Sequence, residues 1–117
     1  MGFDVSLVDA KTGIPVRVDR HEEGGTYVVG GTESAELNIT YNYSKWYYQH
    51  ICPLRGLRCL DGVAGAQAIP VLENAISELN TDQADFYWEP TEGNARHALT
   101  ILLKWAQGNP DARFEVQ

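Results

Sequence analysis

The chain has 117 residues, of which 44% are hydrophobic and 21% are charged, and its formal net charge is −7. This length and composition predict one soluble globular domain over residues 1–117. The negative charge argues against binding to a nucleic-acid backbone, and the lack of an apolar run of about 20 residues argues against a membrane span. No signal peptide is recognisable at the start of the sequence, so we expect a cytoplasmic protein.

Four short segments near the start of the chain have the composition of β-strands. Residues 3–9 and 14–19 alternate apolar and polar side chains, which is typical of half-buried strands, and turn residues lie between them. These two segments predict an opening β-hairpin. Residues 26–29 and 35–40 predict two further strands, separated by a Gly-Gly turn.

Three later segments have the spacing of amphipathic helices. The first follows Asn42, whose short side chain suits a helix N-cap, and ends before Pro53. Its ring side chains repeat at three- and four-residue intervals, as on one helix face: Tyr43, Trp46, Tyr47 and His50.

The second helix is expected over residues 69–79, where Pro70 is acceptable only in the first turn. The third begins after Thr91 as N-cap and ends before Gly108. Residues 112–116 predict a last short strand. Strands followed by helices predict an α+β fold, in which a small antiparallel sheet of N-terminal strands packs against about three helices.

The junction between the 35–40 strand and the first helix is the candidate binding site. Asn38 and Thr40 share one strand face, and Tyr43 and Tyr47 share one helix face. We therefore expect a pocket here, in which hydroxyl and amide groups lie beside aromatic rings. Its expected lining is Asn38, Thr40, Tyr41, Tyr43 and Tyr47, with Arg55 or Arg58 reaching an anionic group. The alternative is that Thr40 and Asn42 only cap the helix.

Signals for catalysis or metal binding are weak. His50 and Cys52 are two residues apart and point in different directions on a helix, and the three histidines lack the spacing of metal ligands. Cys52 and Cys59 are expected to be free thiols in a reducing compartment. We expect no catalytic residue, no metal site and no cofactor, although a small enzyme of unknown reaction stays open.

Several short motifs carry a resemblance to a protein family. They are Gly30-Gly31-Thr32, Asn38-Ile39-Thr40-Tyr41-Asn42, Ile69-Pro70-Val71-Leu72-Glu73, Tyr87-Trp88-Glu89-Pro90-Thr91-Glu92-Gly93-Asn94 and Asn109-Pro110-Asp111-Ala112. Over residues 24–117 the chain resembles a family of small uncharacterised bacteriophage and prophage proteins. The resemblance implies a phage accessory protein in the host cytoplasm, and it implies no particular mechanism.

Two binding hypotheses follow. The first is a non-enzymatic accessory protein that binds a small polar ligand, such as a nucleotide derivative, or a host factor, and so counters host defence. The alternative is an acidic protein–protein inhibitor of a host enzyme, since aromatic side chains are common in interface cores. Self-association stays open, because no heptad or other seam marks an oligomer interface.

Overall fold

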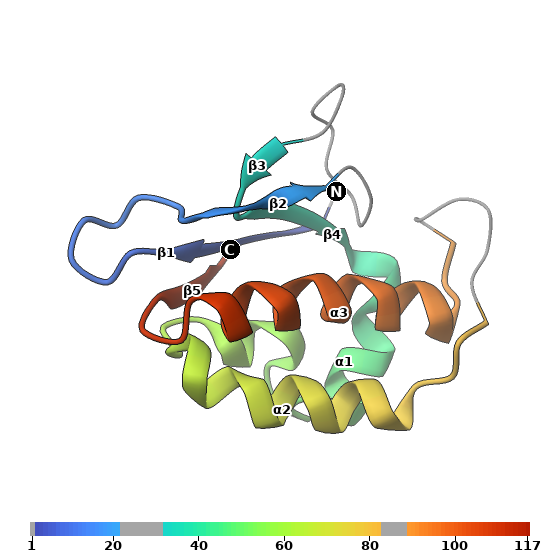
Figure 1. The fold of residues 1–117 in the computed structure, drawn as a ribbon. Coiled ribbons are helices and arrows are strands. Elements are labelled where there is room, and N and C mark those ends of the chain that lie inside the picture. Colours follow the sequence, from blue (N-terminus) through green and yellow to red (C-terminus); the bar gives the residue numbers. More distant parts are fainter. Residues whose placement is uncertain (1, 22–31, 83–88) are drawn as a thin grey trace.

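A computed structural model describes residues 2–21, 32–82 and 89–117, in which strands form one layer and helices the other (Figure 1). The strands are β1 (Gly2–Val8), β2 (Arg17–His21), β3 (Thr32–Ser34), β4 (Glu36–Thr40) and β5 (Arg113–Val116). The α-helices within these ranges are α1 (Ser44–His50), α2 (Gly65–Glu78) and α3 (Glu92–Gly108), and the short 3-10 helices are η1 (Tyr41–Tyr43) and η2 (Gly56–Leu60). The α+β fold with a small antiparallel sheet is therefore confirmed.

The main sheet has the order β4-β1-β5, and both pairings are antiparallel. Alternate side chains of its central strand point toward the helices, so Phe3, Val5 and Leu7 are buried. Asp4 lies on the opposite face and is exposed. The expected strands at 35–40 and 112–116 are both present, whereas the expected 26–29 strand lies outside the described residues.

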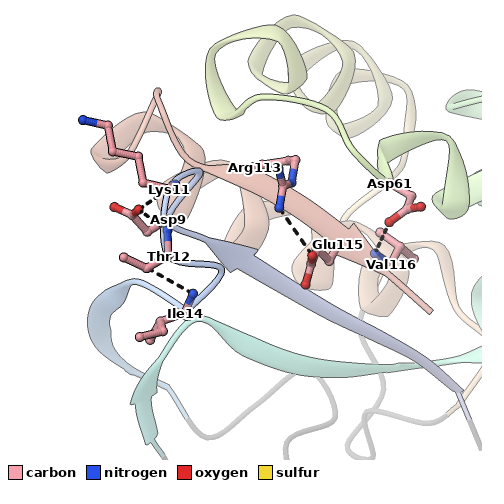
Figure 2. A network of polar contacts seen from close by, with 8 residues as sticks. All are labelled: Asp9, Lys11, Thr12, Ile14, Asp61, Arg113, Glu115 and Val116. Atoms are coloured by element: carbon pink, nitrogen blue, oxygen red, sulfur yellow. Dashed lines mark hydrogen bonds and ion pairs between the residues drawn. The ribbon is translucent and has the colours of Figure 1, made fainter.

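The expected hairpin of residues 3–9 and 14–19 forms only next to its turn, where the Asp9 amide donates to the Ile14 carbonyl and the Val16 amide donates to the Leu7 carbonyl, both at 2.9 Å. The turn itself forms: the Asp9 carboxylate accepts hydrogen bonds from the backbone amides of Lys11 (2.8 Å) and Thr12 (3.0 Å), as Figure 2 shows. Beyond the Val8–Pro15 bridge the two segments separate, and β2 pairs with β3 in a second sheet. They separate because β4 and β5 occupy the two edges of β1.

The first helical segment begins differently from the prediction. Thr40, and not Asn42, provides the cap: its hydroxyl accepts from the Asn42 amide at 3.2 Å, and its backbone is extended. Asn42 lies inside η1, so the expected Asn42 N-cap is wrong. By contrast, Thr91 caps α3 as expected, because its hydroxyl accepts from the Asn94 amide at 3.1 Å.

The second helix begins at Gly65 rather than at Ile69, which places Pro70 beyond the first turn. The expected position of Pro70 is therefore wrong. The reason is tertiary: the Gly65 amide donates to the Ala112 carbonyl at 2.7 Å, and the Ala66 amide donates to the Pro110 carbonyl at 2.9 Å. These bonds satisfy free amides of the first helical turn.

The core lies between the two layers. Leu72 from α2, Leu99 and Leu102 from α3 and Phe114 from β5 are completely buried. The segment before α2 is held against the sheet as well, since the Asp61 carboxylate accepts from the Val116 amide at 3.0 Å (Figure 2). On the neighbouring part of β5, Arg113 and Glu115 form an exposed ion pair at 3.6 Å.

Cys52 and Cys59 form a disulfide, with 6.3 Å between their Cα atoms. The expectation of free thiols is therefore wrong. The two cysteines meet because the chain between them reverses at Gly56, which has a φ of +59°. The disulfide closes the short connection from α1 to η2.

In the described parts of the chain, no helix combines the length and apolar composition that a membrane crossing requires.

Candidate functional site

Tyr43 and Tyr47, two of the expected ligand contacts, are buried in the core. Their rings meet edge to face with their centres 6.2 Å apart. The Tyr47 hydroxyl donates to the Ala95 carbonyl of α3 at 3.0 Å. Burial raises the pKa of the Tyr47 phenol well above its ordinary value, and the neighbouring Tyr43 adds to the shift. The two rings thus join η1 and α1 to α3, and neither belongs to the described lining of the two hollows described below.

Asn38 lies apart from these rings, whereas Thr40 is buried at the end of β4, next to η1. Asn38 is on the outer face of the sheet, where its amide donates to the Asp4 carboxylate at 2.9 Å. Its neighbours Leu37 and Ile39 are buried on the inner face with the tyrosines. The strand–helix junction therefore does not bring the expected polar and aromatic groups into one pocket, and ligand contact by them stays a prediction.

Tyr41, Arg55 and Arg58 are on the surface of the molecule. The Arg58 guanidinium lies 4.9 Å from the centre of the Phe3 ring and 6.0 Å from that of the Tyr41 ring. The Phe3 and Tyr41 rings themselves meet edge to face, with their centres 4.8 Å apart. Among the expected site residues, the structure brings Tyr41 and Arg58 together, and Arg55 is exposed three residues earlier.

A hollow of about 860 Å³ lies between β2 and α3, and we call it the β2–α3 cleft. Its α3 side is one helix face, formed at positions i, i+4, i+7 and i+8 by His97, Ile101, Lys104 and Trp105. The described residues that line the cleft are Arg17, Val18, Asp19, Arg20, His21, His97, Ile101, Lys104, Trp105, Gly108 and Asn109.

The charged residues in the described lining of the β2–α3 cleft are mostly cationic. Arg17, Arg20 and Lys104 are exposed, and Asp19 is the only acidic residue among the described lining residues. Arg17 also pairs with Glu33 at 2.6 Å across β2 and β3, where both side chains are solvent-accessible. Such an exposed pair is weak, so the guanidinium keeps the capacity to bind a second anion.

His21 and Trp105 form the wall where β2 meets α3. Their ring centres are 5.3 Å apart, and the Nε2 atom of His21 lies 2.9 Å from the Ser34 carbonyl oxygen, to which it donates. Its Nδ1 atom is buried and has no hydrogen-bond partner among the described residues. Val18 and Ile101 are half-buried and contribute apolar surface to the same hollow.

Sequence reasoning missed the β2–α3 cleft. The apolar face of α3 was recognisable, but His97 and Lys104 on another face are usual for a solvated helix surface. The pairing of this face with β2 depends on β2 leaving β1 for β3, which the strand pattern did not predict.

A second hollow of about 490 Å³ lies on the outer face of the main sheet. Its described lining includes Asp4, Glu36, Asn38 and Glu115 and contains no lysine or arginine, so it is unsuited to an anion. Within the described ranges, no group of three or more His, Cys, Asp or Glu side chains is arranged to hold a metal ion.

Comparisons with models of protein families, with curated proteins and with solved structures find no match to this chain.

Proposed function

We propose that this chain is a non-enzymatic accessory protein that binds a small anionic ligand in the β2–α3 cleft. The observation that carries the proposal is the gathering of Arg17, Arg20 and Lys104 around one hollow of a protein whose net charge is −7. Cationic side chains in a hollow attract an anion even when the rest of the surface is acidic.

The volume and lining of the cleft support a phosphate-bearing compound with a flat ring, such as a nucleotide. Its volume of about 860 Å³ falls within the range of small-molecule sites. Val18, Ile101 and Trp105 supply apolar surface for a ring. The three cations supply charge-assisted hydrogen bonds to phosphate oxygens, which are stronger than bonds between neutral groups.

The resemblance to bacteriophage proteins supports a cellular role for such binding. A phage accessory protein that removes a small anionic ligand from solution counters a host defence that depends on that ligand. This role is part of the proposal, and it depends on ligand binding rather than on a reaction.

Isothermal titration calorimetry with adenosine 5′-monophosphate tests the proposal. We expect binding that weakens as salt rises, because ions screen exposed charges. Inorganic phosphate should bind more weakly, since it lacks the ring, and adenosine should bind more weakly, since it lacks the charge.

The decisive variant is Lys104→Gln, because Lys104 is exposed at the cleft and the described side chains include no ion-pair partner for it. It should weaken nucleotide binding about fivefold, which corresponds to about 1 kcal/mol. Lys11→Gln removes the same charge at the exposed 9–13 turn, outside the cleft, and should bind like the parent. Equal binding by the two variants, or adenosine binding as tightly as the nucleotide, would contradict the proposal.

A further inference from the structure

We propose that a second surface, formed by α1, η1 and η2, docks a short acidic segment of a partner protein. This proposal is independent of the β2–α3 cleft. The surface, which we call the α1–η2 face, consists of Tyr41, Lys45, Tyr48, Leu54, Arg55 and Arg58.

The first observation is a separation of charge along the chain. No Asp or Glu occurs between Glu36 and Asp61, whereas Lys45, Arg55 and Arg58 all fall in this interval. The interval therefore carries +3 in a chain of −7, which leaves −10 on the rest. Since α1 and η2 pack against each other, the folding of the chain keeps these cations on neighbouring elements.

The second observation is the exposure of large apolar side chains among these cations. Leu54 is 85% exposed, and Tyr41 and Tyr48 are each 40% exposed. Burial of such side chains at an interface is favourable. Tyrosine and arginine are also the residue types that most often dominate the binding energy of protein interfaces.

Contacts within the α1–η2 face hold its side chains in place. Arg58 lies over the rings of Phe3 and Tyr41, and the Lys45 ammonium lies 4.6 Å from the centre of the Trp46 ring. Tyr48 lies against Gly56, where an added Cβ would be only 3.3 Å from the ring. A side chain at position 56 would therefore disturb the Tyr48 ring as well as strain the backbone.

The backbone of the connecting segment is also fixed. The Cys52–Cys59 disulfide closes it, the Gly56 amide donates to the Cys52 carbonyl at 2.9 Å, and the Arg58 amide donates to the Arg55 carbonyl at 3.1 Å. Leu54 and Arg55 are thus presented on a constrained loop. Prior ordering lowers the entropy that a surface loses when it binds a partner.

Charge complementarity selects a short acidic protein segment as the occupant. A nucleic acid is also anionic, but it is long and uniformly charged. It would extend beyond the face and be repelled by the rest of the chain, whose net charge is −10. The molecule measures only 36 × 32 × 22 Å, so a long polyanion bound to the face would also lie near other parts of this acidic chain. A short acidic segment avoids this repulsion.

Fluorescence anisotropy with defined probes tests the proposal. The probes are a labelled octapeptide in which Asp and Glu alternate with Leu and Phe, a basic octapeptide of the same apolar content and a 12-nucleotide oligothymidylate. We expect the acidic peptide to bind at least tenfold more tightly than either of the others. Tighter binding of the oligothymidylate would overturn the choice of a protein partner, and equal binding of the basic peptide would overturn the electrostatic argument.

Two exposed substitutions locate the binding without disturbing the fold. Leu54→Ser removes an apolar side chain that is 85% exposed, and Arg55→Gln removes an exposed charge. Each should weaken binding of the acidic peptide two- to fivefold and leave the thermal midpoint unchanged. Arg58→Lys, which keeps the charge but loses the planar group above Phe3, should weaken it as well.

Lys104→Gln is the matched control, because Lys104 belongs to the cleft and not to the α1–η2 face. It should bind the acidic peptide like the parent. Peptide binding that is lost in Lys104→Gln and kept in Leu54→Ser and Arg55→Gln would place the peptide in the cleft and overturn this proposal. Concentration-dependent self-association that Leu54→Ser abolishes, without peptide binding, would make a second copy of the chain the occupant and also overturn it.

Discussion

The substitution Tyr47→Phe tests the role of the buried phenol as a structural group. The side chain is completely buried, and the substitution removes only the hydroxyl, which donates to the Ala95 carbonyl at 3.0 Å in the parent. Ring volume is almost unchanged, so no cavity forms. A hydrogen bond of this kind contributes about 1 kcal/mol, and the variant should be less stable than the parent by about that amount at pH 7.

The pH dependence of this difference is a sharper test than its size. Burial raises the pKa of Tyr47 in the folded chain, so its stabilising effect is complete below the unfolded pKa of about 10 and is lost as the pH rises further. Above about pH 10 the Tyr47 phenol loses its proton in the unfolded parent and keeps it in the folded parent. Each further pH unit then removes up to about 1.4 kcal/mol from the parent and nothing of this kind from the variant.

Urea unfolding followed by tryptophan fluorescence between pH 8 and pH 11 measures both effects. The two proteins should differ by about 1 kcal/mol up to about pH 9.5 and become equally stable between about pH 10.5 and pH 11. The other tyrosines ionise in both proteins and cancel in the comparison. Parallel loss of stability by parent and variant from pH 10 to pH 11 would show that Tyr47 is not held neutral by burial.

Further substitutions examine the core and the first turn. Leu72→Ala and Leu102→Ala should each lower the free energy of unfolding by about 2–5 kcal/mol, because both side chains are completely buried between the layers; an unchanged urea midpoint for either would exclude it from the core. Asp9→Asn should lower the thermal midpoint at pH 7, since hydrogen bonds from the Lys11 and Thr12 amides hold the pKa of the Asp9 carboxyl below its ordinary value of 3.8. That stabilising effect is present above the ordinary pKa and is lost as the pH falls through the lowered one, so the difference between parent and Asp9→Asn should shrink below about pH 3.8.

The parts of the fold that could be predicted from the sequence are those determined by the residue pattern within one segment of chain. The apolar stripe of α3 and its Thr91 cap both lie where the spacing and the side-chain chemistry predicted them. Leu72 and Leu102 fall within two of the expected amphipathic helices, and both are completely buried. A repeat of 3.6 residues is visible in one segment of chain and needs no knowledge of its neighbours.

The parts that failed depend on contacts between distant segments. Helix α2 begins at Gly65 because its first amides bind carbonyls near residue 110, and no pattern within 65–79 shows this. The pairing of β2 with β3 depends on the occupation of β1 by β4 and β5.

The same limit applies to the candidate sites. The expected pocket assumed that a strand face and the following helix face meet, but Asn38 is on the outer side of the sheet and Tyr47 is on the inner side. The β2–α3 cleft joins residues 17–21 to residues 97–109, which are about 80 positions apart in the sequence. Tyr41 and Arg58, which the sequence did select, are together on the α1–η2 face.

The most direct test of the proposed function is a map of amide chemical shifts in ¹⁵N-labelled protein during titration with adenosine 5′-monophosphate. If the ligand binds in the β2–α3 cleft, the largest shifts will occur in residues 17–21 of β2 and residues 97–109 of α3 and its end. Shifts confined to residues 38–47, or to the α1–η2 face, would contradict the assignment of the ligand to the cleft.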